Sequence, residues 1–287
     1  MQTLRQLREL FDAEGLHPKK RFGQCFLIDG NLMDRLLEMT ELTGNETVLE
    51  IGPATGSLTE DILPRAARVV ACEIDTQLSE VLKRRLDDPK LTVIVGDVLA
   101  GKHEVAEEAL AAVLPVAHLV SNLPYNIATP VVALCLQLSW RAAHGDEAAC
   151  RFDRLTFTVQ KEVADRLAAG PGSKDYGPVS VLVSLLGKLE LGPLVPATAF
   201  WPAPKVASRI VRIDWDPIAA SRVDDLDDLT SLVQMAFGKR RKQIGAIFRA
   251  TDRADTLLAA MAAAGVDPTS RPEQISPEQF LTMATGG

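Results

Sequence analysis

Residues 48–56, VLEIGPATG, place a short apolar run directly before a turn that contains two glycines. The segment that follows, SLTEDILPRA, has the spacing of a helix. Glycine in such a turn allows the backbone to approach a ligand closely. Similar turns often serve only to enter a helix, so this turn alone is a weak indication of a binding site. The succession of a predicted strand, a turn and a predicted helix is the repeating unit that indicates the fold.

The same alternation continues along the chain. Apolar runs recur at RVVACEID, LTVIVGD and AHLVSNLPY, and the helical patterns TQLSEVLKRRL and EVAEEALAAVL separate them. Further apolar segments follow at PVVALCLQLSW, LTFTVQKEV, VSVLVSLLG and RIVRIDW. Strands that alternate with helices indicate a parallel sheet covered on both faces. Right-handed crossovers then predict a doubly wound, Rossmann-like α/β fold.

The character of the sequence changes after Trp215. The polar, acidic stretch DPIAASRVDDLDDL precedes segments that all have helical character: LTSLVQMAF, KRRKQIGAIFRA, RADTLLAAMAAAG and SPEQFLTMAT. We therefore predict an N-terminal extension and a Rossmann-like domain in residues 1–217. A small all-helical domain is expected in residues 218–287.

The composition is that of a globular protein, with 47% hydrophobic and 24% charged residues among 287. No apolar run approaches the roughly 18 residues of a membrane span, and the N-terminus lacks the apolar core of a secretory signal. The four cysteines are scattered, which favours free thiols in a reducing cytosol over disulfides or a zinc site. We expect a cytoplasmic protein with no metal ion and no membrane partner.

The net charge of −7 and the pI of about 5.2 argue mildly against a nucleic-acid partner. Basic residues nevertheless cluster at residues 19–21, 83–85 and 239–242. Each cluster alone is most simply a solvated face. Three clusters in an acidic chain make a one-sided basic surface more plausible.

Acidic residues stand where the predicted strands end, and open α/β sheets bind ligands at that edge. Glu73 follows Gly52 by about 20 residues, the distance at which an acid accepts hydrogen bonds from ribose hydroxyls. Asp97, after the next run, can accept from an adenine amino group. One such acid alone is as readily a helix N-cap. Because the turn after Gly52 lacks the GxGxxG pattern of dinucleotide sites, S-adenosylmethionine fits better than a dinucleotide.

The fourth run ends in SNLPYN, residues 121–126. The Asn122 side-chain oxygen and the carbonyl of Leu123 can hold the hydrogens of an exocyclic amine, which aims its lone pair at a sulfonium methyl. Pro124 fixes the backbone, and Tyr125 offers a flat face to a base that has left its stack. Alignment, with no strong general base, then suffices for methyl transfer. The alternative is a turn with a half-buried tyrosine.

With these residues in place, the chain resembles the small-subunit ribosomal RNA adenine N6,N6-dimethyltransferases from about Lys19 to Met283. The motifs occur in order: KKRFGQCFLID, VLEIGPATGSLT, EID, GDVL, SNLPYNIATP, QKEVADRLAAGPGSKDYGPVSV, VPATAFWPAPKVASRIVRI and AFGKRRKQI. The resemblance implies two successive methyl transfers to each of two adjacent adenosines near the 3′ end of 16S rRNA. The substrate would be the maturing 30S subunit, S-adenosylmethionine the methyl donor, and the enzyme a monomer.

The resemblance also assigns residues by position. It places Cys25, Leu27, Gly52, Glu73, Asp97 and Asn122 at the cofactor. It gives catalysis to Asn122, Leu123, Pro124 and Tyr125, with Phe200 closing on the other face of the base. The RNA phosphates would be met by Lys19, Lys20, Arg21, Lys239, Arg240, Arg241 and Lys242. The N-terminal segment is expected to close over the site.

Two positions depart from the family pattern. Cys25 stands where the family usually has asparagine, so one cofactor hydrogen bond is lost or passes to the backbone. Ala54 stands where many members have glycine, so the turn is predicted to avoid a positive φ there.

Three other functions compete. A 23S rRNA dimethyltransferase of the macrolide-resistance type would tend to be more basic. A DNA adenine methyltransferase would more often have proline in place of Leu123. A non-catalytic ribosome-assembly or transcription factor would not need an intact Glu73, Asp97, Asn122 and Tyr125.

Overall fold

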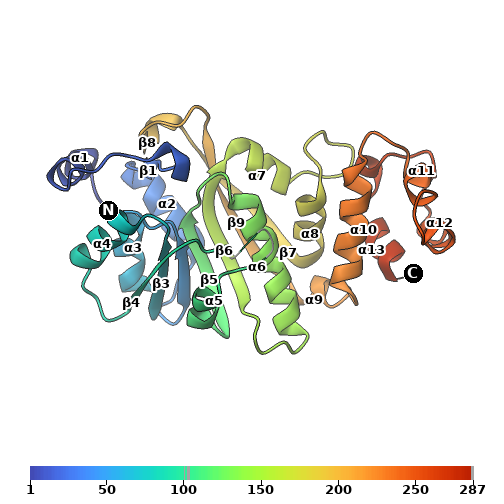
Figure 1. Cartoon of the computed structure of the whole chain (residues 1–287), viewed down its shortest axis with the longest axis horizontal. Coiled ribbons are helices and arrows are strands. Elements are labelled where there is room, and N and C mark those ends of the chain that lie inside the picture. Colours follow the sequence, from blue (N-terminus) through green and yellow to red (C-terminus); the bar gives the residue numbers. More distant parts are fainter. Residues whose placement is uncertain (100, 102–103, 286–287) are drawn as a thin grey trace. The chain divides into compact units, whose positions relative to one another are not determined.

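The computed structural model describes residues 1–99, 101 and 104–285, with the side chain of Lys20 outside this description. The chain forms two compact units (Figure 1). The first combines Met1–Ala164 with Glu190–Asp214, and the second combines Asp165–Leu189 with the chain from Trp215 onward. Residues 165–189 thus group with the helical unit, although they precede the predicted boundary at residue 217.

A seven-stranded sheet with the order β4-β3-β2-β5-β6-β9-β7 is the centre of the fold (Figure 1). Its strands are β2 (Thr47–Ile51), β3 (Arg68–Glu73), β4 (Leu91–Val95), β5 (Val116–Asn122), β6 (Arg151–Gln160), β7 (Gly187–Val195) and β9 (Ser208–Trp215). Neighbouring strands from β4 to β6 are parallel. The predicted Rossmann-like arrangement is confirmed, and the carboxyl ends of β2, β3, β4 and β5 meet at one edge.

Beyond β6 the sheet is no longer parallel. Strand β9 runs antiparallel to β6, with Thr158 opposite Ile210. The predicted parallel arrangement does not extend to this edge, because an apolar run such as RIVRIDW carries no information about strand direction. The run VSVLVSLLG forms helix α8 (Pro178–Leu186), since a short run that is apolar throughout suits a buried helix as well as a strand.

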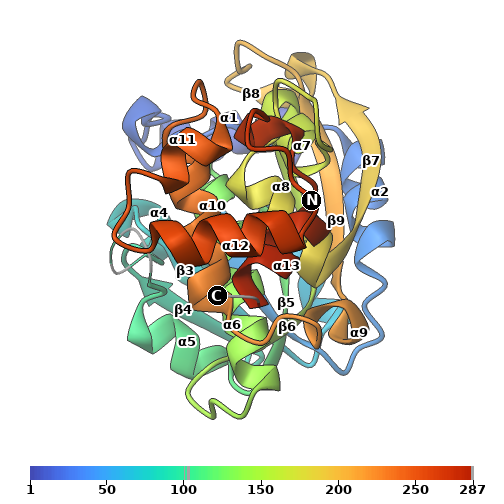
Figure 2. The same cartoon turned by 90° about the vertical axis from the view of Figure 1, so that its right-hand side faces the viewer.

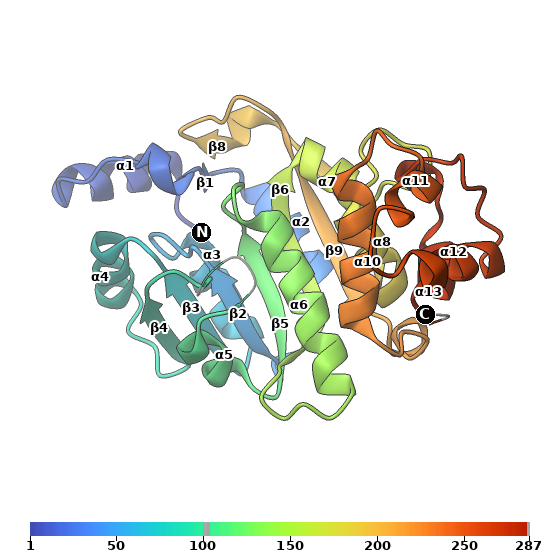
Figure 3. The same cartoon turned by 45° about the vertical axis from the view of Figure 1, so that its right-hand side comes forward.

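Helices follow the parallel strands as the alternating pattern predicts. They are α3 (Ser57–Ile62), α4 (Thr76–Arg85), α5 (Glu107–Val113) and α6 (Ala128–Ala143), with the short 3-10 turn η2 (Leu63–Arg65) after α3, while α2 (Gly30–Thr40) precedes β2. Aspartates begin two of them: Asp29 accepts from the N–H of Leu32, and Asp75 from that of Gln77. Helix α6 lies in front of β5 and β6 in Figure 3, whereas α2 lies behind them.

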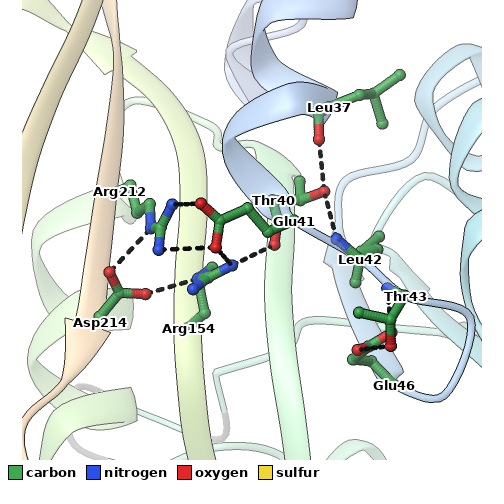
Figure 4. A network of polar contacts seen from close by, with 9 residues as sticks. All are labelled: Leu37, Thr40, Glu41, Leu42, Thr43, Glu46, Arg154, Arg212 and Asp214. Atoms are coloured by element: carbon green, nitrogen blue, oxygen red, sulfur yellow. Dashed lines mark hydrogen bonds and ion pairs between the residues drawn. The ribbon is translucent and has the colours of Figure 1, made fainter.

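An ion-pair network fixes the end of α2 to the sheet (Figure 4). Glu41, which follows α2 with a φ of +48°, pairs with Arg154 on β6 at 2.8 Å and with Arg212 on β9 at 2.7 Å. Both arginines also pair with Asp214, at 2.6 and 2.9 Å. Their side chains are only 17% and 12% exposed. Partly buried, multiply bonded pairs of this kind hold geometry better than isolated surface pairs.

The N-terminal segment forms an arm on the first unit. It contains α1 (Leu4–Ala13), the 3-10 turn η1 (Lys20–Phe22) and β1 (Phe26–Leu27). Strand β1 pairs antiparallel with β8 (Phe200–Trp201), which follows the 3-10 turn η3 (Ala197–Ala199) (Figure 3). Phe11 of α1 lies edge-on to Trp201, with ring centroids 5.3 Å apart. Aromatic and aliphatic packing therefore holds the arm in place.

The second unit is helical (Figure 2). Besides α8 it contains α9 (Pro217–Ala220), α10 (Leu226–Gly238), α11 (Ile244–Phe248), α12 (Ala254–Ala263), the 3-10 turn η4 (Pro272–Gln274) and α13 (Pro277–Thr285), while α7 (Lys161–Leu167) runs into it from the first unit. Tyr176 is fully buried there, and its hydroxyl donates to the carbonyl of Ile275 at 3.0 Å. Within the described part of the chain, no helix is long and apolar enough to cross a membrane.

Candidate functional site

A cavity opens at the carboxyl ends of β2, β3 and β5. The space inside it is about 750 Å³ when the part open to solvent is included. Its lining includes Cys25, Leu27, Gly52, Glu73, Asn122, Leu123, Pro124 and Tyr125. The structure thus brings together most of the residues that the sequence nominated for cofactor binding and catalysis, from the arm and from three strand ends.

A second hollow adjoins the first and shares Phe22, Gly52, Ile74 and Pro124 with it. Asp97 stands exposed at this hollow, and its Oδ1 accepts from the N–H of Leu99 at 2.9 Å. Ile74, 42% exposed, borders both hollows. Sequence reasoning missed this residue, although an apolar side chain directly after the acid of a strand end is a usable signal. Glu73 thus lines the first hollow and Asp97 the second.

The turn after β2 has three left-handed positions: Gly52 with φ +68°, Ala54 with φ +54° and Gly56 with φ +83°. The prediction that Ala54 avoids a positive φ is wrong. The backbone N–H of Ala54 donates to Oε2 of Glu73 at 2.9 Å, which fixes the peptide in this conformation. A Cβ at Gly56 would come within 2.4 Å of Leu82 Cδ1, and the φ of +83° is one that side chains rarely adopt, so both favour glycine there.

Glu73 is 3% exposed and holds two backbone groups at once. Oε2 accepts from Ala54, and Oε1 accepts from the N–H of Asp75 at 2.8 Å. Burial raises the pKa of Glu73, and these backbone hydrogen bonds oppose the rise. Each carboxylate oxygen retains a second acceptor position. The carboxylate can therefore fix the turn and still accept from ligand hydroxyls.

A second carboxyl group lines the cavity, and sequence reasoning did not single it out. Glu50 is 2% exposed and accepts from the hydroxyl of Thr59 at 2.7 Å. Burial raises its pKa to about 8, and the nearby Glu73 adds to the rise. Glu50 lies within the apolar run that forms β2. From the sequence alone, a single acidic residue in such a run cannot be distinguished from one on the surface.

The basic arm segment is tied to Asp75, the N-cap residue that precedes α4. Asp75 accepts from Lys19 Nζ at 2.9 Å and from Gln24 Nε2 at 3.1 Å. Burial opposes ionisation of Asp75, but these hydrogen bonds outweigh it and lower its pKa. Arg21 is exposed and lies over the ring of Phe22. The side chain of Lys20 lies outside the described residues.

Two side chains of SNLPYN are anchored from other strands. Asn122 Nδ2 donates to the backbone carbonyl of Cys25 at 2.8 Å, and its Oδ1 accepts from the hydroxyl of Thr158. The Tyr125 hydroxyl lies 2.8 Å from Oγ of Ser208. Thr158 and Ser208 are distant in sequence, on β6 and β9, so no local pattern could reveal them.

Cys25 contacts Asn122 through its backbone and not through its side chain. Burial raises the pKa of the thiol, which keeps it neutral. Because the contact belongs to the main chain, it does not depend on the residue type at position 25. That one cofactor hydrogen bond is lost at position 25, or passes to the backbone, stays a prediction.

Phe200 lies outside the cavity lining in this structure. Its side chain is 3% exposed, packs in an apolar cluster with Leu27 and Met33, and is not among the residues that line the cavity. Its register partner on β1 is Leu27, which does line the cavity. The expected stacking of Phe200 on the substrate base stays a prediction.

The basic residues that the sequence nominates for RNA binding in the helical unit occupy the turn between α10 and α11. Lys239, Arg241 and Lys242 are exposed. Arg240 instead donates to the carbonyl of Ser173 at 3.2 Å and lies 3.7 Å from Glu273. Three of the four cations are thus open to solvent.

The same chain can be compared with known proteins. Residues 15–285 match the family described as ribosomal RNA adenine dimethylase. The chain is 38% identical over 286 residues to the ribosomal RNA small subunit methyltransferase A of Phenylobacterium zucineum, covering 99% of this chain and 93% of that protein. Identity to the Rhodospirillum rubrum protein of the same name is 39% over 285 residues, with 97% and 91% covered.

Solved structures agree in fold. A dimethyladenosine transferase from Plasmodium falciparum superposes with a TM-score of 0.67 at 23% identity, covering 90% of this chain and 95% of that one. The 23S rRNA methyltransferase ErmE gives 0.60 at 26% identity, with 91% and 98% covered. A family match over nearly the whole chain, relatives close to 40% identical and a cavity at the expected strand ends lead to one conclusion. The chain belongs to the ribosomal RNA adenine dimethylase family.

Proposed function

We propose that this protein uses S-adenosylmethionine to dimethylate N6 of two adjacent adenosines near the 3′ end of 16S rRNA. The observation that carries the proposal is the placement of Asn122 and Tyr125 beside Glu73 in one cavity, each anchored by a named partner. The near full-length relatives named small subunit methyltransferase A support the small-subunit rRNA as the substrate.

The residues present fit the proposed cofactor. Glu73 keeps acceptor positions for ribose hydroxyls, and Asp97 stands at the adjoining hollow where an adenine amino group can donate to it. Ile74 gives an apolar wall between them. Cys25, Leu27, Gly52 and Asn122 line the remainder. When bound, S-adenosylmethionine supplies a methyl group that is already activated.

The protein's contribution to the chemistry is alignment. The Oδ1 of Asn122 and the carbonyl of Leu123 accept the amine hydrogens of the adenine, which turns the nitrogen lone pair out of conjugation. Pro124 restricts the backbone directly after them. Tyr125, with its hydroxyl held at Ser208, presents its ring to the flipped base. Phe200 would reach the other face of the base only after leaving its apolar cluster.

Cations on each unit supply the proposed RNA contacts. Arg21 on the arm and Lys239, Arg241 and Lys242 on the helical unit are exposed, and such contacts make binding fall steeply with salt. Lys19 pairs with Asp75, and Arg240 pairs with Glu273. To bind RNA phosphates, each of these cations must either contact its acidic partner and the phosphate together or exchange the one for the other. We propose that the helical unit binds the ribosome, and that a monomer acts on maturing 30S subunits in the cytoplasm.

A second candidate is methylation of 23S rRNA, which the likeness to ErmE favours. That likeness, at 26% identity, is weaker than the 38–39% identity to the small-subunit enzymes. The acidic composition also favours the small-subunit reading.

The decisive experiment transfers labelled methyl from S-adenosylmethionine to 30S subunits that lack the modification, and maps the products by mass spectrometry. We expect N6,N6-dimethyladenosine at two adjacent positions near the 16S 3′ end. Fully modified 30S subunits and the Asn122→Ala enzyme are the controls without label. Label on free 23S rRNA alone would transfer the protein to the second candidate. No label on either RNA would refute both.

A further inference from the structure

Thr158 lies directly beside the catalytic motif. It is the register partner of Asn122 across the parallel pair β5–β6, and it is fully buried. Its hydroxyl donates to Asn122 Oδ1. Because Thr158 has no access to solvent, no water molecule can take over this hydrogen bond without repacking.

The two partners of Asn122 decide which way its amide points. A backbone carbonyl can only accept, so the contact with Cys25 requires the Nδ2 end of the amide. Oδ1 is then directed at Thr158, whose hydroxyl is able to donate. The carbonyl oxygen has two acceptor positions, and Thr158 occupies one of them. A reversed amide would present N–H groups to a substrate amine that must itself donate.

We propose that Thr158 is a positioning residue for methyl transfer, whose hydroxyl holds Asn122 Oδ1 with its second acceptor position toward the target amine. The inference rests on the proposed role of Asn122. Without the hydroxyl, the amide is held at the Cys25 end only and can swing about its side-chain torsions. The substrate amine then meets its acceptor in the correct geometry for a smaller fraction of the time.

The same strand provides a matched control. Thr156 stands two residues before Thr158, on the same face of β6. It is also fully buried, but its hydroxyl has no hydrogen-bond partner within the part of the chain that the structure describes. Replacing either threonine by valine removes one buried hydroxyl from the same strand and face while keeping the branched shape. Only at position 158 does the change remove a contact to Asn122.

The test compares Thr158→Val with Thr156→Val in methyl transfer to unmodified 30S subunits. We expect kcat of Thr158→Val to fall by about tenfold to about a hundredfold, with the KM for S-adenosylmethionine within about twofold of the wild-type value. Thr158→Ser, which keeps the hydroxyl, should recover most of the loss. Thr156→Val should behave as wild type. Crystal structures of both valine variants should show a displaced or reversed Asn122 amide in Thr158→Val alone.

The outcomes separate the two proposals. An active wild-type enzyme with kcat unchanged in Thr158→Val overturns the positioning role and leaves the proposed function intact. An unmoved Asn122 amide in the Thr158→Val crystal structure overturns it independently of activity. If wild-type protein methylates no rRNA, the proposed function fails and this inference fails with it. Should Thr158→Val not fold, the comparison of Thr158→Ser with Thr158→Ala carries the same test.

Discussion

The backbone N–H of Ala54 donates to Oε2 of Glu73 at 2.9 Å, although Ala54 has the left-handed φ of +54°. This bond joins the turn after β2 to the acid that ends β3. A left-handed alanine costs roughly 1 kcal/mol, which the hydrogen bond to a buried carboxylate offsets. The turn and the acid therefore behave as one unit, and a change to Glu73 should also disturb the turn.

Glu73→Gln should weaken cofactor binding by at least about tenfold. The carboxylate accepts from two backbone N–H groups, at Ala54 and at Asp75, whereas the amide of glutamine has only one oxygen. Its NH₂ end must face one of these donors. Isothermal titration with S-adenosylmethionine measures the effect, with Glu80→Gln on the exposed face of α4 as the control. Equal affinities for wild type and Glu73→Gln would contradict this account of the turn.

The contribution of Glu50 to the stability of the wild-type protein should decrease as the pH rises from about 5 to about 8. Burial raises the pKa of Glu50 to about 8, so the folded state keeps a proton that the unfolded state releases above its ordinary pKa of 4.5. The stabilisation is complete below that lower pKa and is lost toward the higher one, with a slope of up to about 1 kcal/mol per pH unit. Urea unfolding at several pH values measures it.

Glu50→Gln supplies the control for that pH dependence. Glutamine can still accept from Thr59 but carries no titrating proton, so the slope between pH 5 and 8 should flatten. Glu107→Gln, at the exposed start of α5, should leave the slope as it is. A slope in Glu50→Gln identical to that of wild type would assign the effect to another group.

Tyr125→Phe should keep methyl transfer within about tenfold of wild type, whereas Tyr125→Ala should lose about a hundredfold or more. Phenylalanine retains the ring on which the base stacks and loses only the anchor to Ser208. Single-turnover rates on unmodified 30S subunits distinguish these contributions, and circular dichroism verifies folding. Equal losses in the two variants would mean that the hydroxyl, and not the ring, is required.

Arg154→Met should lower the free energy of unfolding at pH 7 by about 1–3 kcal/mol. The change removes a cation that pairs with Glu41 and Asp214 and donates to the carbonyl of Thr40 (Figure 4). The pKa of Glu41 is lowered, first of all by its hydrogen bond to Arg212. The network therefore stabilises the folded state at pH values above the ordinary pKa of Glu41. The penalty should therefore shrink as the pH falls below about 4.

Arg35→Met is the matched control for this network. Arg35 pairs with Glu38 on the surface of α2, with side chains 67% and 62% exposed. Exposed pairs of this kind contribute little, so unfolding should be unchanged within error. A penalty at Arg35 as large as the one at Arg154 would show that the partly buried geometry is not the cause.

The parts of the site that the sequence predicts are those that depend on chain order. Glu73 and Asn122 were found because parallel strands end at one edge, so acids and amides at successive strand ends meet there. Thr158 and Ser208 were missed, because the register between distant strands decides which side chains touch. The prediction for the φ of Ala54 was wrong, because this angle depends on a hydrogen bond to Glu73 at the end of another strand.

The helical unit shows the same limit. Helix α8 lies within the sequence of the predicted first domain, yet residues 165–189 group with the chain after Trp215. The buried Tyr176 hydroxyl, bonded to Ile275, is one contact that joins these distant segments. Pairing of this kind is a property of the packed chain and leaves no local pattern.

The pairing of Leu27 with Phe200 has a consequence for thermodynamic linkage. Leu27 lines the cavity proposed for the cofactor, and Phe200 belongs to the segment proposed to meet the base. A cofactor that stabilises β1 through Leu27 also stabilises its partner strand β8. Conversely, an RNA that displaces Phe200 of β8 also disturbs β1. The coupling free energy between the two ligands must then be the same whichever binds first. Cofactor affinity measured with and without RNA would therefore report RNA affinity measured with and without cofactor.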